Sequence, residues 1–369
     1  MRPTEIESLD EFDRLTSHGT RDLGRLHLQS VDLSDRADVV ARIEVSGALF
    51  LGCRFAPGTG PGSEIDVLER GGLVFPAVPD VPFDPYRASL YTPTDLYDHL
   101  DHGYAATLDA AAYAWSRGPR TLDKSLAAAL HDHAIDDAVE EFAEGRSLVG
   151  VMGGHAVARD TPAYLTAARL GHALAGGDGL TLLTGGGPGA MEAANLGAWL
   201  AGEPEDALER ATGLLAAVPE FTPDVTGWAR AAFAVRERWP SGGVSVGIPT
   251  WFYGHEPPNV FATAVAKYFR NALREDVLLR LCRAGIVFLP GAAGTVQEIF
   301  QSACANYYTE PDLVAPMVLL GRDYWTAQVP VWPLLDVLGR GRAFGPRLYL
   351  LDDPAEVLPL LLQEGGGGR

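Results

Sequence analysis

Three short apolar runs in the second half of this chain each end in a cluster of glycines. They are Ser147–Met152 before Gly153, Leu180–Thr184 before Gly185, and Ile286–Leu289 before Pro290-Gly291. Continuous apolar runs of this length, bounded by glycine, are typical of strands that are buried on both faces of a parallel sheet. We therefore expect three parallel strands whose glycine-rich loops meet at the carboxyl edge of one sheet.

Helical segments alternate with these runs. The helix after the first run is the clearest, because Thr161 can cap it, Pro162 suits its first turn and Gly176-Gly177 can end it. Such alternation predicts an α/β fold over residues 144–369, a Rossmann-like doubly wound parallel sheet flanked by helices. The other strands are expected at Gly213–Val218, Val244–Ile248, Pro316–Leu320 and Leu348–Leu351.

Residues 1–143 have a different pattern. Runs at Leu26–Val31, Gly47–Gly52 and Gly72–Phe75 lie among many Gly and Pro residues, which predicts a small α+β region of unknown role. Residues 104–143 have a helical pattern, and no repeat of fixed period is evident. His131 and His133 are two positions apart and would lie on different faces of a helix, so we expect a surface helix and no metal site.

Composition limits the possible partners. The chain has 29 Lys and Arg against 48 Asp and Glu, a net charge of −19, which disfavours nucleic acid and anionic membranes. Three widely spaced cysteines and no CxxC pair are typical of a reduced, cytoplasmic protein. The first residues lack the apolar run of a signal peptide, and no 18-residue apolar stretch predicts a membrane span.

The glycine-rich loops suit a phosphate group. A loop that leads from a strand into a helix directs backbone N–H groups to one point, and the helix dipole adds partial positive charge. Glycine permits the close approach of an anion to the backbone. The alternative is that the glycines only end strands. Since no GxGxxG is followed by an acidic residue about 20 positions later, we expect no dinucleotide and no other cofactor.

Two of these loops resemble the LOG (Lonely-guy-like) family over residues 147–320. The family motif PGGxGTxxE corresponds to the segment from Pro290 to Glu298, with Ala292 in place of the second glycine and Gln297 where many members have Glu. A GGG loop that opens a helix corresponds to Gly185–Gly189 with Met191, and the family's first loop is similar to Met152-Gly153-Gly154.

The resemblance implies an activity and an assembly. LOG enzymes hydrolyse the N-glycosidic bond of nucleoside 5′-monophosphates, in some cases cytokinin nucleotides, and they are usually dimers or larger. Family members use the Glu that ends the motif and an Arg on the preceding helix. The corresponding residues are Glu298 and Arg274, with Arg270 as the second choice. The resemblance also implies a phosphate site formed by Gly153, Gly154, Gly185, Gly186, Gly187, Gly189, Met191, Gly291, Ala292, Ala293, Gly294 and Thr295.

Glu298 has two possible roles. Hydrolysis through an oxocarbenium-like state needs a carboxylate that activates water and stabilises the ribosyl cation. However, Thr295-Val296-Gln297-Glu298 also fits a capping box, in which the Glu bonds back to the helix start. The sequence pattern alone allows both roles, and the family resemblance favours catalysis.

A helix is expected from about Asn259 to Leu281, because apolar residues recur every four positions. Lys267, Arg270 and Arg274 would then share a second face and form an anion site, or else an ordinary solvated face paired to Glu275.

Other residues are predicted near the base and the ribose. The aromatic segment from Trp251 to Glu256 follows a strand at the same edge. It would either bind the base, with His255 and Glu256 as its polar groups, or form a packed loop. Glu192 and Asn195 would either reach the ribose hydroxyls or serve only as polar helix residues. A non-catalytic nucleotide sensor is the main alternative function, and a structural oligomer is a third.

Overall fold

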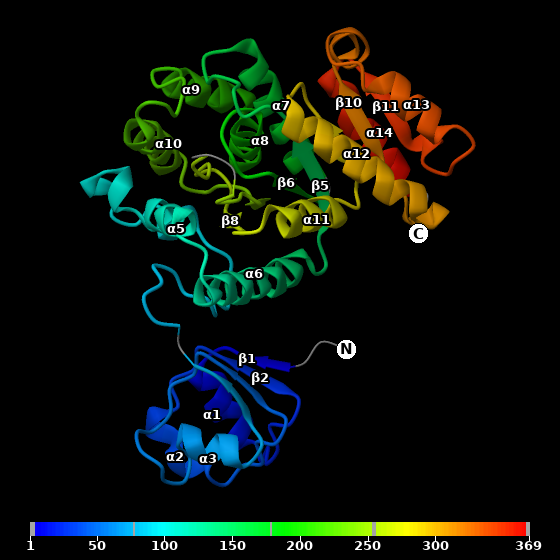
Figure 1. The fold of residues 1–369 in the computed structure, drawn as a ribbon. Helices are drawn as coiled ribbons and strands as arrows, with labels where there is room; N and C mark the ends of the chain where they lie inside the picture. Colours follow the sequence, from blue (N-terminus) through cyan, green and yellow to red (C-terminus); the bar gives the residue numbers. More distant parts are fainter. Residues whose placement is uncertain (1–3, 77, 178, 253–255, 367–369) are drawn as a thin grey trace. The chain divides into compact units, whose positions relative to one another are not determined.

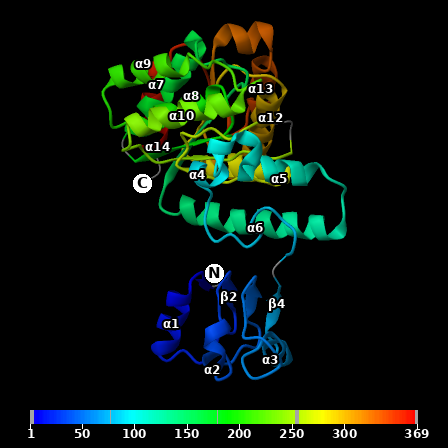
Figure 2. The same cartoon turned by 90° about the vertical axis from the view of Figure 1, so that its left-hand side faces the viewer.

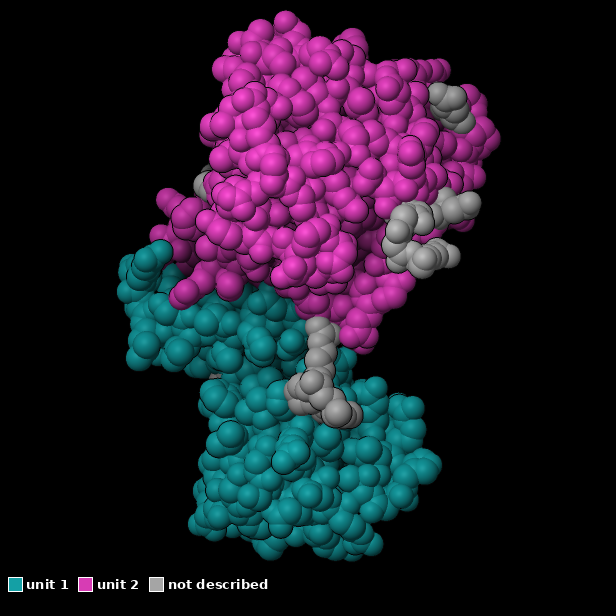
Figure 3. Space-filling model, turned by 90° about the vertical axis from the view of Figure 1, so that its right-hand side faces the viewer, with its two compact units in different colours: residues 1–89, 119–138 teal, residues 90–118, 139–369 magenta. Residues whose placement is uncertain are grey.

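The computed structural model describes residues 4–76, 78–177, 179–252 and 256–366. These residues form two compact units, shown in different colours in Figure 3. Unit 1 contains residues 1–89 and 119–138, and unit 2 contains residues 90–118 and 139–369. The division differs from the boundary expected near residue 143, because residues 90–118 belong to the same unit as the large sheet.

Unit 1 is built on a four-stranded sheet in the order β1-β2-β3-β4. All four strands are parallel, and the register joins Thr4 to Leu26, His27 to Leu49, and Leu49 to Leu73. The elements are β1 (Thr4–Ile6), α1 (Leu9–Ser17), β2 (Leu26–Gln29), α2 (Ala37–Val40), β3 (Leu49–Leu51), α3 (Glu64–Glu69) and β4 (Leu73–Phe75).

The register of unit 1 corrects the expectation that the chain has no repeat. Successive strands recur after 22, 22 and 24 residues, which is the spacing of a solenoid repeat. Leu28 and Phe50 occupy equivalent positions and are both buried in the core of the unit. The repeat is hard to see in the sequence because the equivalent side chains differ in size and the period is not constant.

Helix α6 (Leu122–Ala143) begins in unit 1 and ends in unit 2. Its helical character is as expected. The expectation of a surface helix is wrong at His131, whose side chain is buried and packs edge-on against Phe83, whereas His133 is exposed as expected. Burial, which disfavours the charged form, lowers the pKa of His131.

Unit 2 is an α/β unit in which helices flank a seven-stranded parallel sheet (Figures 1 and 2). The strand order is β11-β10-β9-β5-β6-β7-β8, so the Rossmann-like fold is confirmed. The strands are β5 (Ser147–Met152), β6 (Leu180–Thr184), β7 (Ser245–Gly247), β8 (Ala264–Val265), β9 (Ile286–Phe288), β10 (Met317–Leu320) and β11 (Leu348–Leu351).

The helices of unit 2 follow most of these strands. Helix α7 starts as expected, since the Thr161 side chain accepts a hydrogen bond from the backbone N–H of Tyr164. The helices are α4 (Pro93–Leu96), α5 (Leu108–Arg117), α7 (Pro162–Gly176), α8 (Ala190–Trp199), α9 (Glu205–Leu215), α10 (Val225–Arg238), α11 (Asn271–Leu281), α12 (Ala293–Tyr308), α13 (Trp332–Gly339) and α14 (Val357–Gly366). Among the described residues, no helix is both long enough and apolar enough to cross a bilayer.

Two expected elements of unit 2 are wrong. The segment Gly213–Val218 is the end of α9 and the turn after it, not a strand, because a short apolar run does not distinguish a buried helix from a strand. The expected helix over residues 259–281 begins only at Asn271. The part before it contains β8, which pairs with β7 at the sheet edge. An apolar period of four is also a multiple of two, so a strand satisfies the same pattern.

Candidate functional site

The candidate site lies where the order of the strands reverses. The chain builds the sheet outward from β5 through β6 and β7 in one direction, and from β9 through β10 and β11 in the other. The loops after β5 and β9 meet here, because the N–H of Gly154 donates to the Pro290 carbonyl over 3.1 Å. Ligands of open α/β sheets bind in the crevice at such a switch point.

The loop after β9 leads into an exposed helix start at this edge of the sheet. Helix α12 begins at Ala293, and residues 292–294 are exposed while Gly291 and Thr295 are buried. A Cβ at Gly291 would lie 2.2 Å from the Thr295 hydroxyl, so glycine is required for this turn. The first N–H groups of a helix have no partner within it, and a helix of 16 residues adds its dipole. The arrangement suits an anion.

The GGG loop after β6 is buried in the protein. A Cβ at Gly185 would lie 2.5 Å from the Arg274 guanidinium and 2.6 Å from the Met191 sulfur. Gly186 has a φ of 72° and packs against Pro249. The close approaches that require glycine here are to protein atoms, and a phosphate contact at this loop stays a prediction.

Of the remaining glycines, Gly153 and Gly189 lie at close contacts between the loops. A Cβ at Gly189 would lie 2.5 Å from the Gly154 carbonyl, and one at Gly153 would lie 2.9 Å from the Ala190 side chain. Gly187 approaches Met191 in the same way, whereas Gly294 faces open space. The three loops therefore form one packed assembly at the carboxyl edge of the sheet.

Glu298 and Arg274, both predicted as site residues from the family resemblance, lie together. Arg274 Nη1 is 3.4 Å from the Glu298 carboxylate and 2.7 Å from the Glu275 carboxylate. Its Nε donates to the Ile248 carbonyl over 2.7 Å, and its Nη2 to the Gly185 carbonyl over 3.4 Å. Arg274 therefore connects Glu298 to the GGG loop and to the end of β7.

The capping-box interpretation of Glu298 is wrong. The residue at the N-cap of α12 is Ala292, which has no side-chain acceptor, and Thr295 lies inside the helix. Glu298 is only 6 % exposed, and its carboxylate is directed at Arg274 rather than at the helix start. Helix capping therefore does not explain why this carboxylate is buried.

Burial raises the pKa of Glu298 from an ordinary value of 4.5 to about 7. The Arg274 charge opposes this shift, and the charge of Glu275 adds to it. Glu275 has a second carboxylate oxygen that is buried without a hydrogen-bond partner. Two carboxylates therefore share one guanidinium, and Glu298 titrates near neutral pH, where an acid–base group is most effective.

This pKa predicts how stability depends on pH. A carboxyl group with a raised pKa in the folded state stabilises the fold fully below pH 4.5, and that contribution is lost as pH rises to about 7. At 1.36 kcal/mol per pKa unit, the ionised group costs about 3 kcal/mol at pH 8. We expect Glu298→Gln to be more stable than wild type at pH 8 and equally stable near pH 4.5, as measured by urea unfolding. A variant that is less stable at pH 8 would contradict the raised pKa.

The cationic face expected on one helix does not exist. Lys267 lies in extended chain before α11 and is buried against Asp109, whereas Arg270 is the exposed N-cap residue of that helix. Of the three cations, Arg274 is the one that contacts Glu298. The structure thus separates residues that a continuous helix would have placed on one face.

The aromatic segment after β7 is in part a packed loop. Trp251 is buried and stacks on Phe269 with the ring centroids 4.5 Å apart, so its indole face is occupied by the protein. Glu256 is half-buried, and its carboxylate lies 3.5 Å from His155 Nδ1, on the loop after β5. His255, predicted to bind the base, lies outside the described residues.

Glu192 and Asn195 have protein partners for their polar groups. The Glu192 carboxylate forms a fully buried ion pair with Arg159, with Nε 3.0 Å from Oε2. Asn195 bonds to Thr184, Ser245 and Asn259 at 2.6–3.0 Å and is fully buried. The interpretation as polar helix residues accounts for both, and a ribose contact by either stays a prediction.

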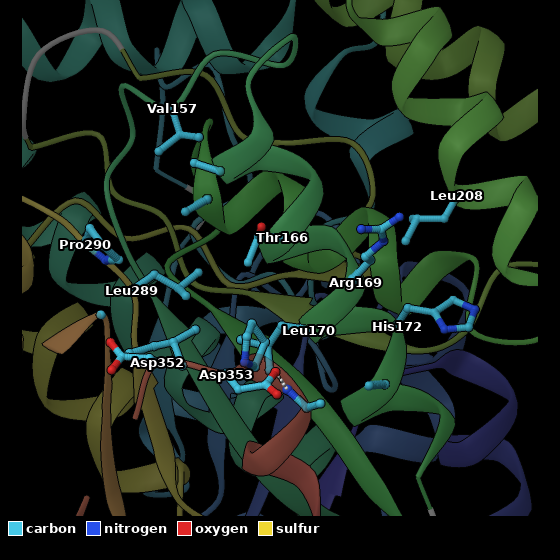
Figure 4. Close-up of a pocket in the computed structure, with 17 residues that line it drawn as sticks. Val157, Thr166, Arg169, Leu170, His172, Leu208, Leu289, Pro290, Asp352 and Asp353 are labelled. Carbon is cyan, nitrogen blue, oxygen red and sulfur yellow. Dashed lines mark hydrogen bonds between the residues drawn. The ribbon is translucent and has the colours of Figure 1, made fainter. Parts of the chain in front are cut away.

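A pocket of about 790 Å³ opens at the same edge of the sheet, beyond Leu289 and Pro290. Figure 4 shows Asp352 and Asp353 on one side of it and Arg169 and His172 on the other. Its lining comes mainly from α7, with residues from the carboxyl ends of β9, β10 and β11. Neither Glu298 nor Arg274 lines the pocket, so the pocket is separate from the buried pair that these two residues form.

Three residues of this site are not predicted by the sequence patterns. The pattern predicts Glu275 as a partner on a solvated face, yet it is buried beside Arg274. Asn259 was interpreted as a helix start, yet its side chain bonds to the Gly187 carbonyl. No sequence pattern indicates a role for His155, which lies on the loop after β5 beside Glu256. For Glu275, the available sequence signal is its position directly after Arg274. Within the described residues, no cluster of three His, Cys, Asp or Glu could hold a metal ion.

No protein-family model matches this chain, and no curated protein is significantly similar to it. Solved structures that are similar include three of the molybdenum cofactor carrier protein from Chlamydomonas reinhardtii. Two of them share 19 % identity, cover 60 % of this chain and 99 % of theirs, and have a TM-score of 0.37. The third has 18 % identity, the same coverage of this chain, 98 % of its own and a TM-score of 0.36. Similarity at this level carries no argument about function.

Proposed function

We propose that this chain hydrolyses the N-glycosidic bond of a nucleoside 5′-monophosphate, releasing the free base and ribose 5-phosphate. The observation that carries the proposal is the buried Glu298, whose pKa is raised to about 7 and whose carboxylate contacts Arg274 beside an open helix start. The resemblance of this segment to the LOG family points to the same reaction.

The proposed chemistry uses few groups. The 5′-phosphate binds at the exposed start of α12, over residues 292–294, where helix N–H groups and the helix dipole favour an anion. Holding the phosphate fixes the position of C1′ relative to the carboxylate. The C1′–N bond breaks as the base takes up a proton from solvent. Water then adds to C1′, and the proton that it loses passes to Glu298 and from there to solvent, so the products are the free base and ribose 5-phosphate.

Arg274 has an electrostatic role in this scheme. Its guanidinium keeps part of the Glu298 population ionised at neutral pH, because a neighbouring positive charge lowers a carboxyl pKa. It also bonds to the carbonyls of Ile248 and Gly185, so its position is fixed by the ends of two strands. A positive charge that is held in place in this way can stabilise the negative charge that develops on the leaving base.

The test is an assay of free base and ribose 5-phosphate after incubation with AMP, GMP, CMP, UMP and a cytokinin nucleotide. We expect at least one of them to be hydrolysed, and Arg274→Ala to lower kcat/KM by roughly 100-fold, the scale of a lost transition-state contact. Arg270→Ala is the matched control, since Arg270 is exposed at the start of the same helix. Tight nucleotide binding without release of base would favour the sensor function instead.

A further inference from the structure

A segment from the first half of the chain forms part of unit 2. Residues 90–118, which we call the clasp, belong to the same compact unit as the seven-stranded sheet. Tyr91 pairs with Val265 in an antiparallel bridge at the sheet edge, with N–O distances of 3.0 and 2.7 Å. The Tyr97 hydroxyl donates to the Pro258 carbonyl over 2.6 Å. The clasp therefore holds the chain that runs from β7 to α11.

Asp109 is the centre of these contacts. Its side chain is 2 % exposed, and Oδ1 accepts hydrogen bonds from Lys267 Nζ at 2.5 Å and from Trp251 Nε1 at 2.8 Å. The Tyr104 hydroxyl donates to Oδ2. Lys267 is equally buried, and its ammonium group lies 5.2 Å from the centre of the Trp251 ring. The buried carboxylate is thus satisfied by three donors, which fixes one arrangement of the network.

Trp251 connects Asp109 to the candidate site. Asp109 fixes it from one side, and Ile248, three residues before it, contacts the site directly. Ile248 accepts the hydrogen bond from Arg274 Nε, and the N–H of Asn259 donates to the Gly186 carbonyl over 2.9 Å. A displacement of Trp251 would therefore shift Ile248 and with it Arg274, which also donates to the Gly185 carbonyl of the GGG loop.

Stability alone is a weak reason for such a pair. Burying two charges costs about as much in desolvation as their attraction returns, so an apolar pair of similar size often serves stability equally well. A buried charge pair does select one geometry over others. The geometry points to Asp109 as a positioning residue. Through Trp251 it holds Ile248 and hence Arg274, so the clasp helps to set the geometry of the site. This inference rests on the proposed function.

The experiment uses the full chain with four variants. Asp109→Asn removes one charge, and Asp109→Asn with Lys267→Met removes both while keeping an acceptor for the indole N–H. Trp251→Phe keeps the stack on Phe269 but deletes the hydrogen bond to Asp109. Asp101→Asn is the matched control, because Asp101 lies in the clasp but is exposed. Hydrogen exchange of peptides covering Ser245–Phe252 is measured together with melting temperature, kcat and KM.

We expect Asp109→Asn to lower the melting temperature by roughly 10 °C, because Lys267 is left as an unpaired buried charge. Exchange at Ser245–Phe252 should rise more than in the rest of unit 2. For Trp251→Phe we expect a kcat about 10-fold lower with KM changed less than about threefold, since the phosphate site on α12 is not displaced. The variant with both Asp109→Asn and Lys267→Met should have a higher melting temperature and a higher kcat than Asp109→Asn alone. Asp101→Asn should match wild type.

Two results would overturn the positioning role. One is unchanged exchange at Ser245–Phe252 in both Asp109→Asn and Trp251→Phe. The other is exchange that rises evenly over unit 2, with kcat falling only in proportion to the folded fraction. The exchange readout needs no substrate. If wild type releases no base from any nucleotide, the proposed function fails, while the exchange data still decide whether Asp109 holds the segment around Trp251.

Discussion

Replacing Glu298 by glutamine is expected to lower kcat by about 100- to 10,000-fold, the range for loss of a positioned acid–base group. Glutamine has the same shape and can still accept a hydrogen bond from Arg274, so binding of ribose 5-phosphate should change little. The measurement is steady-state release of base from the nucleotide that wild type hydrolyses best. The control is Glu310→Gln, an exposed carboxylate just beyond the end of the same helix.

The pH profile tests the same assignment independently. Glu298 must be ionised to accept a proton from water, and its pKa is about 7. The wild-type kcat/KM should therefore rise about tenfold per pH unit below pH 7 and level off above it. The charge of Glu275 contributes to the raised pKa, so Glu275→Gln should move this limb to lower pH. A Glu298→Gln variant that keeps full turnover, or a wild-type profile without the acid limb, would remove Glu298 from the mechanism.

Local patterns predicted the part of the site that depends on strand ends. A buried strand followed by glycine is recognisable in one sequence, because only glycine permits the tight turns and close approaches seen at Gly291 and Gly186. The sheet then places all such loops at one edge. The family resemblance predicted Glu298 and Arg274 as site residues, and the structure adds the contact between them.

Features that depend on distant parts of the chain were not predictable in this way. Asp109 and Lys267 are far apart in the sequence, and neither has a local pattern that indicates burial. The segment before α11 has an apolar period that fits a helix, yet pairing with β7 makes part of it a strand. In each case a tertiary contact decides between structures that the local sequence allows equally.

Glu192→Gln is expected to destabilise unit 2 by about 3–5 kcal/mol, the usual cost of leaving a buried charge without its partner. Arg159 would lose the carboxylate that contacts both its Nε and Nη2, deep inside the protein. Its guanidinium also lies 4.5 Å from the centre of the Trp228 ring, and its Nη1 donates to the Trp228 carbonyl, so it cannot turn to solvent without disturbing α10. Chemical denaturation followed by circular dichroism measures the loss.

The exposed ion pair between Arg169 and Glu209 provides the matched control for this prediction. Both of its side chains are about half exposed, so Glu209→Gln should cost less than about 1 kcal/mol. A ribose-binding Glu192 predicts the opposite pattern, in which KM for the nucleotide rises while the free energy of unfolding is unchanged. That outcome would contradict the structural role. The buried pair joins the helix after the GGG loop to the loop after β5. A loss of stability would therefore show that Glu192 holds these two segments together and has a structural role at the site.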